Sequence, residues 1–128
     1  MDNLRIEASD RTPEVDFDFV NNAFALRGES YPEDVNVFYG QLIEHLESHT
    51  ESLSDSELTF TFELIYFNSS TAKILMIIFD LLDSAAEKGS KVTINWIHES
   101  DDDNMEELGN EYGEDLEHAS FNLIPTQS

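Results

Sequence analysis

Cysteine is absent from the 128 residues, which excludes disulfide bonds and any zinc site that depends on thiolates. The first four residues lack the basic and apolar regions of a secretory signal. The longest apolar run covers residues 74–79 and is far shorter than the ~20 residues of a membrane-spanning helix. We therefore expect a cytoplasmic protein that does not cross a membrane.

Basic residues are scarce, because six Lys and Arg stand against 28 Asp and Glu and the formal net charge is −22. Such a charge repels nucleic-acid phosphates and anionic membrane surfaces, so we expect neither as a direct partner. Solubility, or a source organism with a salty interior, is one explanation of the charge. A constitutive acidic interaction module or DNA mimic is another, but mimicry needs charges spaced like phosphates, and the sequence does not reveal that spacing.

Patterns typical of enzymes and metal sites are also missing. No Gly-rich phosphate loop is present, and His45 and His49 lack both the His-Glu-x-x-His pattern and a third ligand. Residues 101–104 resemble the start of a calcium loop, but Glu106 and Tyr112 occupy the positions that require Gly and Glu. We therefore expect no metal or other cofactor and no enzymatic activity.

The hydrophobic residues make up 40% of the chain and include nine Phe, which is enough for one core and predicts a single domain over residues 1–128. Alternation predicts strands near residues 4–8, 15–19 and 23–26, the last two joined at Asn21 and Asn22 as a β-hairpin. Ser30 as the cap, with Pro32 and Glu33, predicts the start of a helix. The apolar face of this helix is formed by Val35, Phe38, Tyr39, Leu42 and Leu46.

The second half of the chain alternates between predicted strands and helices. A polar loop at residues 50–56 precedes a strand in which Leu58, Phe60, Phe62, Leu64 and Tyr66 share one face, with Ile65 and Phe67 on the other. A strand that is apolar on both faces is central in a sheet. A helix then runs to Lys88 and stops at Gly89, followed by a strand at 92–96, a short helix from 101–104 to Leu116 and a strand at 121–124. This order predicts an α/β fold with a mixed central sheet and about three helices.

The junction between the central strand and its helix is the most informative segment. Asn68, Ser69 and Ser70 can cap free N–H groups at the start of the helix, which is what most such residues do. A hydroxyl at this position can also carry a phosphate, because the free N–H groups and the helix dipole stabilise the added negative charge.

The helix that follows carries an apolar pair on its polar side. The residues expected to face the core are Ala72, Leu75, Ile78, Phe79, Leu82 and Ala86. Lys73, Asp80, Ser84 and Glu87 lie on the other side, with Met76 and Ile77 at its edges and Ser69 pointing the same way. An apolar pair beside a modifiable Ser predicts a docking surface. The alternative is that Met76 and Ile77 are covered by a neighbouring helix or are ordinary exposed residues.

Several segments together resemble a known family. Residues 29–33, 66–70, 78–82 and 92–96, with the acidic segment around 105–107 and 114–115, are similar to the SiaC-type regulatory phosphoproteins, relatives of the STAS anti-sigma-factor antagonists. The resemblance implies a STAS-like fold and a bacterial partner-switching protein that a dedicated kinase phosphorylates and a phosphatase resets. Matched by position, the phosphorylated residue is Ser69, with Ser70 and Thr71 as less favoured candidates. Asn68 replaces the Asp of the STAS antagonists, which favours the SiaC-type subgroup and a diguanylate cyclase as the downstream partner.

The hypothesis from the sequence is therefore a phosphoprotein switch. Unmodified Ser69 leaves the docking surface free to bind a signalling enzyme, and phosphate adds roughly −1.5 to −2 charge at its edge. The opposite sign, in which a basic partner pocket prefers the phosphorylated form, remains open at this point. The expected partner-binding residues are Asn68, Ser69, Ser70, Lys73, Met76, Ile77 and Asp80.

Overall fold

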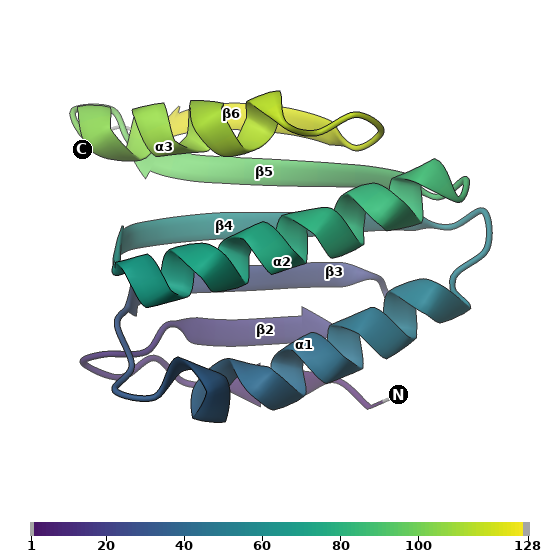
Figure 1. The fold of residues 1–128 in the computed structure, drawn as a ribbon, viewed down its shortest axis with the longest axis horizontal. Helices are drawn as coiled ribbons and strands as arrows, with labels where there is room; N and C mark the ends of the chain where they lie inside the picture. The colour runs from purple at the N-terminus through teal and green to yellow at the C-terminus, as the bar shows by residue number, and fades with distance from the viewer. Residues whose placement is uncertain (1, 127–128) are drawn as a thin grey trace.

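The computed structural model describes residues 2–126, which form six strands and three helices; three strands come first, and helices and strands alternate after them (Figure 1). The strands are β1 (Leu4–Ile6), β2 (Glu14–Asp18), β3 (Ala23–Ser30), β4 (Glu57–Phe67), β5 (Lys91–Glu99) and β6 (Ser120–Thr126). The helices are α1 (Val35–Ser52), α2 (Ser69–Glu87) and α3 (Asp103–Glu114). The α/β fold with a mixed sheet and an N-terminal β-hairpin, predicted from the sequence, is confirmed. Within the described residues, no helix is long and apolar enough to cross a membrane.

The strands lie in the sheet in their sequence order, β1 to β6. The β1–β2 and β2–β3 pairs are antiparallel, and β3 to β6 run parallel to one another. Crossovers between parallel strands are almost always right-handed, so three crossovers that step in the same direction place their helices on one face. Figure 1 shows α1, α2 and α3 in one layer over the sheet. Among residues 2–126, no helix lies on the opposite face of the sheet.

Aromatic side chains fill the space between the sheet and the helix layer. Phe60 and Phe62 stack with ring centroids 4.5 Å apart, and Phe62 stacks on Phe79 of α2 at 5.1 Å. Trp96 of β5 is 1% exposed and extends this cluster toward α3. The alternating residues Val92, Ile94 and Trp96 are all buried, as the sequence predicts.

A bulge near the end of β4 corrects one prediction. Leu64 pairs with Gly28 and Tyr66 with Glu29, so Ile65 has no partner on β3. Gly28 accommodates this irregularity with φ of 113°, a conformation that side chains with a Cβ rarely adopt. Because the extra residue reverses the alternation, Phe67 packs on the core while Tyr66 is 52% exposed. The prediction that Tyr66 shares the buried face of Phe62, with Phe67 on the other face, is therefore wrong for both residues.

The start of α1 corrects a second prediction. Ser30 is the last residue of β3 and fully buried, and Asp34 caps the helix by accepting hydrogen bonds from Asn36 N (3.1 Å) and Val37 N (3.2 Å). The helix also extends into the polar segment predicted to be a loop at residues 50–56, because α1 ends at Ser52. The predicted apolar face is present: Tyr39, Leu42 and Leu46 are buried.

The predicted boundaries of α2 are confirmed. Asn68 caps its start by accepting a hydrogen bond from Thr71 N at 2.9 Å, and Gly89 follows its end with φ of 112°. The buried face is slightly wider than predicted, because Ala72 and Ala86 are half-buried while three additional residues are buried. Those residues are Thr71, Ile74 and Ala85.

Candidate functional site

The junction between β4 and α2 lies at the edge of the sheet where the parallel strands end. Asn68 N donates a hydrogen bond to Ser30 O at 3.1 Å, which ties the end of β4 to the end of β3. Ser69 and Ser70 form the first positions of α2 and both are exposed. The first N–H groups of a helix have no partner inside the helix and carry the positive end of its dipole. This position is therefore accessible to an enzyme and favourable for an added negative charge.

Thr71 differs from the two serines because its side chain is fully buried. Its hydroxyl donates to Ser30 O at 3.1 Å and lies 2.9 Å from Ser30 Oγ, which in turn lies 2.6 Å from the Tyr39 hydroxyl. One arrangement uses all three protons: Tyr39 donates to Ser30 Oγ, Ser30 Oγ donates to Thr71 Oγ1, and Thr71 Oγ1 donates to the Ser30 carbonyl. A kinase cannot reach this hydroxyl in the folded chain, so Thr71 is removed from the three candidates.

This buried network predicts an alkaline effect on stability. Burial raises the pKa of Tyr39 to about 12, with the hydrogen bond to Ser30 acting in the opposite direction. Between pH 10 and pH 12 the unfolded chain releases a proton that the folded chain retains, so Tyr39 stabilises the fold below pH 10 and loses this contribution as the pH rises. The free energy of unfolding is expected to fall by up to ~1.4 kcal/mol per pH unit in this window through Tyr39 alone.

The measurement is urea unfolding of the wild type and of Tyr39→Phe at pH 7, 10.5 and 11.5. At pH 7 we expect the variant to be about 1 kcal/mol less stable, because Ser30 Oγ loses a donor. This deficit should shrink and then reverse as the pH rises. Tyr66→Phe, which removes an exposed hydroxyl, is the control, and equal losses in wild type and Tyr39→Phe would contradict the prediction.

The predicted docking surface lies on the solvent side of α2. We define the α2 face as Ser69, Ser70, Lys73, Met76, Ile77 and Asp80, all of which are exposed. Met76 is 56% exposed and Ile77 44% exposed. No neighbouring helix among the described residues covers these two side chains, so the first of the two alternatives to a docking surface is excluded. Steps of three and four residues align Ser69, Lys73 and Met76 along one stripe of the helix.

Sequence reasoning missed an aromatic pair beside this face. The rings of Tyr31 and Tyr66 meet edge to face with centroids 5.8 Å apart, at the same edge of the sheet as Asn68. The bulge at Ile65 turns Tyr66 outward, so two consecutive apolar residues, Ile65 and Tyr66, are exposed. The run Ile65-Tyr66-Phe67 carried a signal for this, because three consecutive apolar residues of a strand cannot all face one core.

His49 of α1 packs and hydrogen-bonds within the fold. His49 Nε2 lies 2.6 Å from Asn22 Oδ1, and its ring packs edge to face on Phe19. Burial lowers the pKa of His49. The neutral ring therefore holds the β2–β3 turn against the helix.

Comparison with known proteins finds relatives that share this sequence and this architecture. The sequence model described as "SiaC family regulatory phosphoprotein" matches residues 6–126. An uncharacterized protein of Pseudomonas aeruginosa strain UCBPP-PA14 is 32% identical over 117 residues, which is 90% of this chain and 90% of the relative. The crystal structure of apo-SiaC from Pseudomonas aeruginosa superposes with a TM-score of 0.87 at 31% identity, covering 97% of this chain and 99% of that chain.

A second solved structure contains a partner. A chain in the crystal structure of the diguanylate cyclase SiaD in complex with its activator SiaC, also from Pseudomonas aeruginosa, matches with a TM-score of 0.89 at 28% identity. The match covers 96% of this chain and 99% of that chain. Because the family model spans nearly the whole chain, the protein described here belongs to the SiaC family of regulatory phosphoproteins.

Proposed function

We propose that this chain is a phosphorylation-controlled regulator whose unmodified form binds a signalling enzyme of the diguanylate cyclase class and regulates its activity. The observation that carries the proposal is the exposed Ser69 hydroxyl at the start of α2, on the same stripe as the exposed Met76. The related activator SiaC, found in complex with the diguanylate cyclase SiaD, supports the class of partner.

The chemistry of the junction suits a reversible phosphate. The first-turn N–H groups and the dipole of α2 stabilise a phosphate on Ser69, and its exposure lets both a kinase and a phosphatase reach it. These two enzymes complete the set of partners in the proposal. The chain supplies a modifiable hydroxyl and a binding surface, with no cofactor and no catalytic step of its own.

The site of modification is tested directly. The wild type, Ser69→Ala and Ser70→Ala are incubated with magnesium, ATP and a candidate protein kinase from the same organism, and phosphopeptides are mapped by mass spectrometry. We expect one phosphate on the wild type and on Ser70→Ala, and none on Ser69→Ala. Ser70 is the matched control because it is a neighbouring hydroxyl that is also exposed. Labelling that survives in Ser69→Ala would overturn the assignment.

A further inference from the structure

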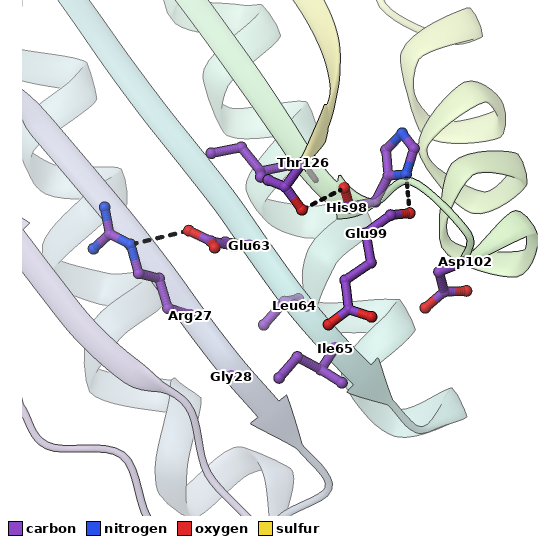
Figure 2. A pocket seen from close by; sticks show the side chains of 10 residues that line it. Arg27, Gly28, Glu63, Leu64, Ile65, His98, Glu99, Asp102 and Thr126 are labelled. Carbon is purple, nitrogen blue, oxygen red and sulfur yellow. Dashed lines mark hydrogen bonds and ion pairs between the residues drawn. The ribbon is translucent and has the colours of Figure 1, made fainter. Parts of the chain in front are cut away.

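The uncovered face of the sheet is hollowed near the ends of the parallel strands, and Figure 2 shows this place from close by. We call it the sheet-face hollow; its volume is about 280 Å³, and the residues that matter here are Arg27, Glu63, Ile65, Ile97, Glu99 and Asp102. They come from β3, β4, β5 and the turn before α3. The hollow therefore lies on the opposite face of the sheet from the helix layer.

The floor of the hollow is apolar and open to solvent. Ile65 is 58% exposed because the bulge leaves it unpaired with β3, and the half-buried Ile97 of the next strand lines the same hollow. An isoleucine exposed on a sheet face is common by itself, but two that line one concave site form a surface from which contact with an apolar group would exclude water.

The rim of the hollow carries unmatched negative charge. Arg27 is already engaged, since its guanidinium lies 3.4 Å from Glu14 Oε1 and 3.5 Å from Glu63 Oε1. Within residues 2–126, no basic group lies within ion-pair distance of the Glu99 or Asp102 carboxylates. Asp102 is held in place because its Oδ1 accepts a hydrogen bond from Met105 N at 3.0 Å. Figure 2 shows the Glu99 carboxylate extending toward Ile65.

We propose that the sheet-face hollow receives an arginine side chain from the protein partner. The aliphatic stem of an arginine can lie along Ile65 and Ile97 while its guanidinium meets Glu99 and Asp102 at the rim. The charge complementarity selects a cation, and the apolar floor selects one with a long stem. The proposal adds to the proposed function, because it names what the regulated enzyme presents to this face.

The position of the hollow agrees with a continuous binding surface. Ile65 is followed directly by the exposed Tyr66, and Ser69 begins α2 three residues later. A partner that covers the α2 face can therefore continue over the Tyr31–Tyr66 pair, around the edge of the sheet, and into the hollow.

The test uses the full chain, labelled with ¹⁵N, and the probe Nα-acetyl-arginine methylamide at low salt. We expect saturable shifts of the amide signals of residues 63–65 and 97–99. The citrulline analogue, which has the same shape without the charge, should give none. Glu99→Gln should weaken binding of the probe about two- to fivefold, as expected for one partly exposed ion pair. Glu107→Gln, an exposed carboxylate on α3 outside the hollow, is the matched control and should leave binding unchanged.

Three results would overturn the inference: shifts that do not saturate, equal shifts with the citrulline analogue, or equal weakening by Glu107→Gln. A second arm measures binding of a candidate diguanylate cyclase from the same organism to the wild type, Glu99→Arg and Glu107→Arg. At least a tenfold loss confined to Glu99→Arg is expected, and equal effects of the two variants would also overturn it. If the cyclase does not bind the wild type, the proposed function fails, while the probe titration still decides the role of the hollow.

Discussion

Phosphorylation of Ser69 should weaken binding of the regulated enzyme by roughly a hundredfold or more. The phosphate adds roughly −1.5 to −2 charge at the edge of the α2 face, and burying such a charge without a basic counterpart costs several kcal/mol. Lys73, one turn along the helix, can offset part of this cost, but an exposed pair of this kind contributes only about 0–1 kcal/mol. The net loss therefore corresponds to two or more orders of magnitude in the dissociation constant.

The measurement is isothermal titration of the cyclase with unmodified chain, with chain phosphorylated on Ser69, and with Ser69→Asp. Ser69→Asp carries less charge than phosphate, so its loss should be smaller, and Ser70→Asp is the matched control. Tighter binding of the phosphorylated chain would reverse the proposed direction of the switch.

Salt distinguishes this switch from a constitutive acidic module. If the partner were held by the net charge of −22, its affinity would fall steeply with ionic strength, because exposed charges are screened within ~10 Å at 0.1 M salt. Binding through Met76 and Ile77 should depend less on salt. A steep salt dependence with no effect of the phosphate would favour the module and remove the switch.

Patterns local in the sequence predicted most of the fold. Strict alternation identified β4 and β5, and the Asn68 cap with Gly89 bounded α2, because these signals are decided within a few residues. Ser30 was wrongly predicted to cap the first helix, because a Ser followed three residues later by Glu is a capping pattern. Ser30 instead forms hydrogen bonds with Thr71 and Asn68, about 40 residues away in the chain, and with Tyr39 inside α1.

The candidate site was predicted only in part, for the same reason. Ser69 and the α2 face follow from helical spacing, which is local. The outward turn of Tyr66 depends on a register shift against Gly28 of another strand. The sheet-face hollow needs the pairing of β3, β4 and β5 and the one-sided placement of the helices, neither of which any single segment encodes.

The attachment of α3 to the sheet depends on Trp96. Its indole Nε1 donates to Met105 O at 3.0 Å, and its ring contacts Phe62, Phe79 and Tyr112. A Cβ added at Gly109 would lie 2.6 Å from Trp96 Cδ1, closer than real Cβ contacts, so the helix approaches the indole ring at a position where only Gly fits. Trp96 therefore joins β5, α2 and α3 in one packed unit.

Trp96→Ala should lower the free energy of unfolding by about 3–5 kcal/mol, because it removes a large buried ring and leaves a cavity. That is a large part of the ~5–15 kcal/mol typical of a domain, so the variant is best followed by circular dichroism in urea at low temperature. Trp96→Phe keeps most of the volume and should cost less, with the lost hydrogen bond to Met105 contributing ~1 kcal/mol. A Trp96→Ala protein as stable as the wild type would contradict this account of the core.

Gly109→Ala adds a methyl group to the same contact from the helix side and should lower the free energy of unfolding by about 1–3 kcal/mol through overpacking. Asp102 caps α3 and also lines the sheet-face hollow. Loosening α3 by Gly109→Ala should therefore weaken binding of the arginine probe as well.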